Sequence, residues 1–344
     1  MTGEPYPIKG AWIQTANVLG GQAARANFHY EALKKLEFVA VVDLFYNPTI
    51  MALADIVLPS STFPEKDSFR SWWAPLSIIK KRVQVGDCKT DWEINFELAK
   101  RFNPEGTQRW GSPMEYFNER LAPSGKTFKD MEEAGGWLMP EDGPAKPYRR
   151  HERGLLRQDG EPGFNTRTGK IEVYCTAYED WDLDPLPFYT EPPQSPVSTP
   201  ELHEKYPLIM ITGARSQLFF HSEHRGIPWL REKEPDPYVE VHPETAADYD
   251  VYDGEWIYLK NDLGKVKRKV MITKRVKPTE IQTLHGWWMP EQEGAEPNLF
   301  GVWDYQINQL VPGPQESQSG FGGGQYKTTL VTLEKINEGA QANG

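Results

Sequence analysis

Three groups of polar residues in this 344-residue chain could do chemistry, and the first centres on Asp43. Asp43 follows the apolar run FVAVV at 38–42, so it stands at the carboxyl end of a predicted buried strand. Open α/β sheets bind ligands at that end, where a carboxylate commonly accepts hydrogen bonds from a ribose or a base edge. A helix N-cap or a solvated loop acid is the alternative, and position alone slightly favours it. The chain has no GxGxxG motif, which argues against an ordinary NAD site.

The second group is HSEHR at 221–225. Two histidines three residues apart could lie on one face of a helix as metal ligands, but no third ligand stands at a suitable spacing. Serine, histidine and arginine together also suit an anion such as phosphate. The anion is the better interpretation of this cluster.

The third group is HGWW at 285–288, at the end of a predicted strand. A core aromatic pair beside a turn explains it equally well. Near the C-terminus, four glycines within 320–324 precede Gln325 and Lys327. Such a segment is either a flexible loop or one that lets the backbone approach a phosphate closely.

The elements that position Asp43 alternate between strand and helix over residues 11–59. The run at 11–16 and the run at 38–42 predict strands, and IVL at 56–58 predicts a third. Apolar residues spaced four apart predict a helix over 22–36, and a short helix is expected at 51–54. This order is half of a doubly wound sheet. Thr90 and Glu93 then form a predicted capping box that opens a helix carrying Ile94, Leu98 and Phe102.

The next segment, 103–205, is rich in proline, glycine and charge and has few periodic stretches. We expect a long connection here, wrapped over other domains, with one short strand at 170–174. From residue 207 the pattern becomes β: strands are predicted at 208–212, 238–241 and 280–284, with a short helix at 243–249. Alternation at 255–260 and 265–273 around an NDLG turn predicts a hairpin. Strands of this length and spacing indicate a small closed barrel.

Bulk properties exclude several classes of function. The net charge of −11 argues against a nucleic-acid partner, and no apolar run approaches the roughly 18 residues that span a bilayer. The two cysteines, Cys88 and Cys175, form no CxxC, so we expect no iron–sulfur or zinc site built from this chain alone. The 12 tryptophans and 15 tyrosines fit a large core or a surface that packs on flat ligands or on another polypeptide.

Taken in order, several segments resemble the C-terminal half of the dimethyl sulfoxide reductase family of molybdopterin enzymes. The most specific are FVAVVDLFYNPTIMALADIVLPSSTFPEKD at 38–67 and RVQVGDCKTDWEINFELAKRF at 82–102. LIMITGARSQLFFHSEHRGIPWLRE at 208–232, PYVEVHPETAADYDVYDGEWIYLKNDLG at 237–264, LHGWW at 284–288 and INQL at 307–310 are similar to the terminal cofactor-binding domain. The resemblance implies an α/β fold: a partial doubly wound parallel sheet, a long connection and a C-terminal double-psi β-barrel.

The resemblance also implies domain limits and a cofactor. Residues 1–105 would be the Rossmann-like part of the family's third domain, 106–205 an extended connection, 206–338 the dinucleotide-binding barrel and 339–344 a disordered tail. The expected cofactor is bis(molybdopterin guanine dinucleotide) carrying Mo or W.

Site residues follow position by position from the same resemblance. Asp43, Asn47 and Thr49 resemble the guanosine-binding corner, although many members have Thr where Asn47 stands. Asn17 and Asp91 match loops that face the same nucleotide. The remaining matches, to segments along the pterin and phosphates and to further cofactor contacts, are Thr212, Gly213, His221, Ser222, His285, Asn308 and Lys327.

No residue of the chain matches the family's catalytic metal ligand or its iron–sulfur motif, which lie upstream of where Met1 aligns. The resemblance therefore implies an oxidoreductase portion that is inactive alone and has the N-terminal half as its partner. An iron–sulfur electron-transfer subunit is a further partner that the family allows. A non-catalytic cofactor carrier and an inactive truncated product are the alternatives. The sequences at 54–67 and 285–288 most resemble the anaerobic branch that includes acetylene hydratase, aromatic transhydroxylases and catechol dehydroxylases. They do not identify a substrate or a compartment.

Overall fold

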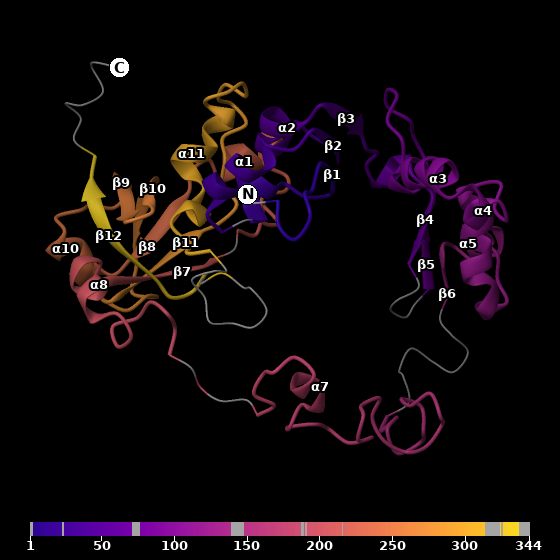
Figure 1. The fold of residues 1–344 in the computed structure, drawn as a ribbon. Coiled ribbons are helices and arrows are strands. Elements are labelled where there is room, and N and C mark those ends of the chain that lie inside the picture. The colour runs from indigo at the N-terminus through magenta and orange to yellow at the C-terminus, as the bar shows by residue number, and fades with distance from the viewer. Residues whose placement is uncertain are drawn as a thin grey trace. The chain divides into compact units, whose positions relative to one another are not determined.

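The computed structural model describes residues 3–22, 24–70, 76–138, 148–186, 189, 191–214, 216–313, 324 and 326–336. Contacts divide the chain into two compact units (Figure 1). We call Met1–Val57 with Tyr189–Gly344 the barrel unit, and Leu58–Phe188 the helical unit. The predicted boundaries at 105 and 205 do not coincide with this division, and as family domain limits they stay a prediction. The predicted tail at 339–344 lies outside the described residues.

A small sheet in the barrel unit carries the first predicted strands. It has the order β1 (Gly10–Gln14), β2 (Phe38–Asp43) and β3 (Ile56–Pro59). Strands β1 and β2 are parallel, in register from Gly10 opposite Phe38 to Gln14 opposite Val42. The run Val39–Val42 is almost fully buried, as the uninterrupted apolar sequence predicts for a strand covered on both faces.

The two helices of this region differ in extent from the predictions. Helix α1 spans Ala26–Leu33 and does not begin at residue 22, because a π-helical turn at Val18–Gln22 and the left-handed Arg25 (φ 52°) come first. Helix α2 spans Pro48–Leu53 and begins earlier than predicted, because Asn47 caps it with Pro48 at its first position.

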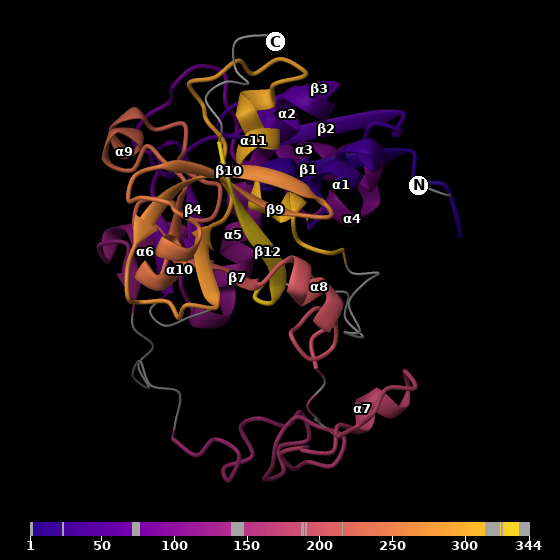
Figure 2. The ribbon, with the colours of Figure 1, turned by 90° about the vertical axis from the view of Figure 1, so that its left-hand side faces the viewer.

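The six barrel strands close in the order β10-β8-β11-β7-β12-β9, which confirms the predicted barrel. All six are labelled in Figure 1, and Figure 2 shows β7, β9, β10 and β12 after a quarter turn. They are β7 (Leu208–Ala214), β8 (Tyr238–Val241), β9 (Trp256–Asn261), β10 (Gly264–Ile272), β11 (Glu280–Leu284) and β12 (Thr329–Lys335). The predicted hairpin is β9 and β10, paired from Asn261 opposite Gly264. Strand β12 was not predicted. Alternate residues of β9 to β11 point inward, and Ile257, Leu259, Val266, Val270 and Ile281 form much of the core.

Short helices close the remaining surfaces of the barrel unit. They are α8 (Pro200–Lys205), α9 (Pro228–Lys233), α10 (Pro243–Asp248), η4 (Leu299–Gly301), α11 (Val302–Tyr305) and η5 (Ile307–Gln309). Helix α10 confirms the predicted helix after Pro243, which occupies the first helical position where its missing N–H costs nothing.

The helical unit shows that the predicted long connection at 103–205 begins with helices, although few periodic stretches were recognised there. It contains η2 (Phe63–Glu65), α3 (Asp91–Phe102), α4 (Pro104–Thr107), α5 (Pro113–Leu121), η3 (Ala122–Ser124), α6 (Phe128–Glu133) and the antiparallel strands β4 (Ser68–Arg70), β5 (Leu76–Ile79) and β6 (Trp137–Leu138). Helices α5 and α6 share a core of Phe117, Leu121, Phe128 and Met131. Their start signals, Ser112 and Thr127, cap them through hydroxyls that accept from Glu115 N and Asp130 N.

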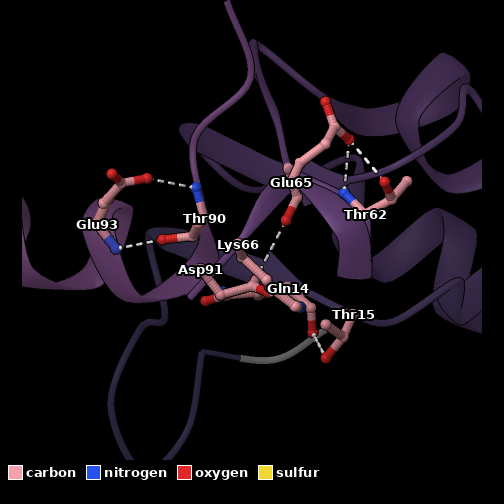
Figure 3. A network of polar contacts seen from close by, with 9 residues as sticks. Gln14, Thr15, Thr62, Glu65, Lys66, Thr90, Asp91 and Glu93 are labelled. Atoms are coloured by element: carbon pink, nitrogen blue, oxygen red, sulfur yellow. Dashed lines mark hydrogen bonds and ion pairs between the residues drawn. The ribbon is translucent and has the colours of Figure 1, made fainter. Parts of the chain in front are cut away.

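Two reciprocal caps organise the start of the helical unit (Figure 3). The predicted box at α3 is present: Glu93 N donates to Thr90 Oγ1 at 3.0 Å, and Thr90 N donates to Glu93 Oε2 at 2.8 Å. Thr62 and Glu65 form a second box at η2. The predicted apolar face of α3 is only partly correct, because Ile94 is buried but Phe102 is exposed.

Residues 148–186 form turns and one short helix, α7 (Thr176–Glu179). The strand expected at 170–174 is wrong. Hydroxyl and carboxylate groups of Thr166, Thr168 and Glu172 bond to nearby backbone and to one another, and such local bonds compete with a strand ladder. Within the described residues, no helix is both long and apolar enough to cross a membrane.

Candidate functional site

Asp43 ends β2 and is tied to the start of α2. Its Oδ1 accepts from Leu44 N at 2.6 Å, and its Oδ2 accepts from Asn47 Nδ2 at 2.8 Å. Asn47 Oδ1 also accepts from Ile50 N at 3.1 Å, so one buried side chain both caps the helix and orients the carboxylate. Burial raises the pKa of Asp43, and the Glu223 carboxylate adds to this rise, while the hydrogen bonds it accepts act in the opposite direction.

Asn17 and Thr49 meet beside this corner. Thr49 Oγ1 donates to Asn17 Oδ1 at 2.8 Å and accepts from Leu19 N at 3.0 Å, while Gly20 N donates to the same Asn17 oxygen at 2.9 Å. Thr49 is fully buried. The Asn17 Nδ2 group is buried without a hydrogen-bond partner among the described residues, so a buried donor is left over.

Asn308 joins the barrel to the turn at Val18–Gln22. Its Nδ2 donates to Gly21 O at 3.3 Å, and its carbonyl accepts from Arg25 N at 2.7 Å. Gln306, fully buried, donates to Leu19 O at 3.0 Å. Within the part of the chain that the structure describes, Asn308 Oδ1 is buried with no donor, so this junction also holds an unused acceptor.

The histidine groups of the sequence come together. His221 Nδ1 and His285 Nε2 lie 2.7 Å apart. The next residue, Ser222, lies against Gly21 so closely that a Cβ on Gly21 would stand 2.8 Å from Ser222 Oγ. Residues 221–226 form turns, and His221 and His224 have positive φ, so the two histidines do not share a helical face as the metal hypothesis required.

Thr212 and Lys327 belong to neighbouring segments of the barrel unit. Thr212 donates from both its amide and its hydroxyl to Tyr326 O, at 2.9 and 2.8 Å. Gly213 follows Thr212 in β7, and Lys327, next to Tyr326, is exposed. Most of the glycine-rich segment at 320–324 lies outside the described residues.

Asp91 belongs to the helical unit, where it is the first residue of α3. There it accepts from Ser60 Oγ at 3.1 Å and lies 3.7 Å from Lys66 Nζ. The other predicted site residues lie in one unit, where four segments converge: the turn after β1, the loop after β2, and the barrel loops at 219–226 and 285–289. The second and third of these approach each other closely, since a Cβ on Gly226 would lie 3.3 Å from the Phe45 ring.

Sequence reasoning missed Gln306 and treated Arg225 only as one member of a cluster that suits an anion. Gln306 stands just before INQL, and no pattern marks it. Arg225 was visible as the cation of HSEHR, but its burial (1% exposed) is a property of the fold. His224, exposed and left-handed, has no place in the junction.

Comparison with known proteins agrees with this geometry. Residues 5–101 match the model of the molybdopterin oxidoreductase family, and residues 208–329 match that of the molydopterin dinucleotide binding domain. The chain belongs to the molybdopterin oxidoreductase family.

Several curated members of the family are similar to the chain. Dopamine dehydroxylase of Eggerthella lenta is 30% identical over 90% of this chain and 36% of its own length. Acetylene hydratase of Syntrophotalea acetylenica is 31% identical over 87% and 40%, and dimethyl sulfoxide reductase DmsA of Escherichia coli is 28% identical over 96% and 42%.

A solved structure extends the likeness to the fold. Acetylene hydratase from Pelobacter acetylenicus superposes with a TM-score of 0.84 at 28% identity, over 97% of this chain and 45% of that one. The chain thus spans less than half the length of these relatives. The α/β fold with a parallel sheet and a closed barrel is confirmed, and the matched barrel domain supports a molybdopterin cofactor.

Proposed function

We propose that the junction in the barrel unit holds the guanine dinucleotide end of bis(molybdopterin guanine dinucleotide), as part of a Mo- or W-dependent oxidoreductase. The observation that carries the proposal is the pair of unused buried groups, Asn17 Nδ2 and Asn308 Oδ1, in the unit that also holds the Asp43 carboxylate. Native proteins rarely leave such groups without partners. A polar ligand with both donors and acceptors would satisfy them.

Asp43 would recognise the base. Guanine presents the N1 and N2 hydrogens side by side, and a carboxylate can accept from both. Adenine has no such paired donors. Asn47 holds Asp43 Oδ2 at 2.8 Å, so the carboxylate is oriented before the ligand arrives.

The barrel loops would hold the rest of the cofactor. His221, Ser222 and His285 carry donors that suit phosphate or pterin oxygens, and exposed Lys327 adds a positive charge. Thr212 and Gly213 would line the same segment. When bound, the cofactor supplies the metal-centred redox chemistry of the family. The residues of this chain bind and orient it.

The partners follow from the length of the relatives. Because the chain spans 36–45% of them, we propose that the remainder of the enzyme carries the metal ligand and any iron–sulfur cluster. A separate iron–sulfur electron-transfer subunit is a further proposed partner. The role of Asp91, which the family resemblance assigns to the same nucleotide, stays a prediction.

Titration of the full chain with GDP and ADP tests the proposal. A hydrogen bond to a charged group is worth about 1.5–3 kcal/mol, so losing even one in Asp43→Ala should lower GDP affinity roughly tenfold to hundredfold. Asp43→Asn should be nearly as damaging, because its amide presents a donor to a donor edge. His224→Ala is the control and should bind GDP like the parent. If Asp43→Ala binds GDP normally in a folded chain, or if ADP competes equally, the proposed nucleotide site is wrong.

A further inference from the structure

We propose that Arg225 is a positioning residue: it holds the loop of His221 and Ser222 against the loop of His285 and Gly286. This inference rests on the proposed function, since it concerns how the two cofactor-facing loops are kept in place. None of the family comparisons assigns Arg225 a role.

The guanidinium bonds to both loops at once. Arg225 Nε donates to Gly286 O at 2.5 Å. Its Nη2 donates to His221 O at 3.2 Å and to His285 O at 3.3 Å. A rigid planar fork can meet carbonyls from two directions, which a lysine ammonium cannot do as readily.

The loops that Arg225 joins approach each other backbone to backbone. Gly286 has φ +65°, and a Cβ there would lie 2.8 Å from His221 C and 2.9 Å from Ser222 N. His221 itself is left-handed at φ 56°, a conformation that persists in a non-glycine residue only when its surroundings impose it. The bond from Arg225 to the His221 carbonyl is such a restraint.

Arg225 is a buried cation without a carboxylate partner among the described residues, so it does not stabilise the fold as part of an ion pair. Arg225 lies 3.9 Å from the Trp287 ring centre and 4.5 Å from that of Phe219, and it is 1% exposed. Its salt-bridge partners would have to be carboxylates, yet no ion pair to Arg225 occurs among the described residues, and its Nη1 has no hydrogen-bond acceptor there. Burying such a cation is costly, and burial lowers its pKa well below the usual value.

Arg231 offers a matched comparison. It is also buried, and it lies 5.5 Å from the same Trp287 ring. Its guanidinium, however, bonds to Glu291, to Glu234 O and to the Met289 sulfur, not to the carbonyls of His221, His285 or Gly286. Of the two arginines, Arg225 is the one that bonds to both histidine segments, so the pair separates positioning from general stabilisation.

The test measures loop opening and ligand binding separately in the full chain. Arg225→Met keeps a long apolar side chain between the rings but removes all three bonds to the loops. Amide hydrogen exchange at 219–226 and 284–287 should accelerate about tenfold or more. GDP affinity should fall about tenfold. Arg225→Lys should recover part of both effects, and Arg231→Met should change neither.

Each outcome supports or overturns the role of Arg225 in joining the two loops. Unchanged exchange in both loops of folded Arg225→Met, or equal acceleration in Arg231→Met, overturns the proposal. If Arg225→Met does not fold, Arg225→Lys decides, because parental exchange in that variant would show that the three-bond fork is unnecessary. If Asp43→Ala leaves GDP binding intact, the proposed function fails, while the exchange result still decides the role of Arg225.

Discussion

At the scale of single residues, Asp43 combines two demands that oppose each other. Its carboxylate is partly buried beside Glu223, which raises its pKa and disfavours the charged form that a guanine ligand would need. Hydrogen bonds from Leu44 and Asn47 recover part of that cost. A residue kept for folding alone would not need a carboxylate here, because a neutral acceptor could serve Leu44 N equally well.

This opposition predicts a pH dependence of stability. A carboxyl whose folded-state pKa is raised stabilises the fold fully below its unfolded pKa, about 3.9, and that contribution is lost as pH rises through the raised folded value. The free energy of unfolding of the parent minus that of Asp43→Asn should therefore fall as pH increases above about 4. Urea unfolding of both proteins across this range measures the difference. A difference that rises with pH would contradict the raised pKa.

At the scale of elements, Glu65 shows how one side chain can organise a loop. It completes the box with Thr62 and also accepts from Val85 N at 2.9 Å and from Cys88 Sγ at 3.2 Å. The bonds from the Thr62 hydroxyl and amide, followed by those from Cys88 and Val85, lower the pKa of Glu65 to about 2. The carboxylate thus joins η2 to the segment that precedes α3.

Glu65→Gln should destabilise the chain at neutral pH. A lowered folded-state pKa gives stability that is present above the unfolded pKa, about 4.3, and is lost as pH falls toward about 2. The variant should lack this acid-dependent loss, so its stability curve should approach that of the parent at low pH. Glu97→Gln, which breaks a surface pair with Lys89, is the control. Parallel curves for the parent and Glu65→Gln would show that these bonds do not stabilise the fold.

Elements with strong local signals were predictable, and those that depend on a single cap were not. The apolar run before Asp43, the NDLG hairpin and the Thr90–Glu93 box each carry enough information in a few residues. Helices α5 and α6 are short and depend on caps at Ser112 and Thr127 inside a sequence rich in charge.

Most residues of the candidate site could be predicted from family resemblance, but the contacts between its loops could not. Family resemblance supplied most candidate residues, and the structure gathers all of them except Asp91 in one unit. No local pattern could reveal that Gln306 bonds to Leu19 across the sequence, or that Arg225 is enclosed between Phe219 and Trp287. Both depend on how distant loops meet, which periodicity and spacing do not encode.

At the scale of the whole molecule, large apolar side chains remain on the surface near the sheet. Tyr6, Ile8, Trp12 and Phe38 are 41–70% exposed. Contiguous exposed apolar surface is typical of regions that pack against another polypeptide. The chain also covers only 36–45% of its relatives, in agreement with a missing packing surface.

We therefore predict that the chain self-associates when purified alone. Size-exclusion chromatography with light scattering should show concentration-dependent oligomers, and Phe38→Ser should reduce them. Phe102→Ser, which removes an exposed phenylalanine from α3, tests whether any such residue has the same effect. A monodisperse monomer of the parent with a cooperative, high-temperature melt would count against the prediction.

The discontinuity of the barrel unit has a consequence for synthesis on the ribosome. The bond between Gln306 and Leu19 spans 287 positions of sequence. Strands β1 and β2 can pair with each other early, but their core partners Trp288 and Leu299 come far later in the sequence. At a translation rate of about 5–20 residues per second, the delay is roughly 15–60 s. The helical unit, which is continuous in sequence, can fold during this delay. Nascent β1 and β2 are therefore the segments on which a ribosome-associated chaperone would act, and slower elongation after residue 57 would lengthen their exposure.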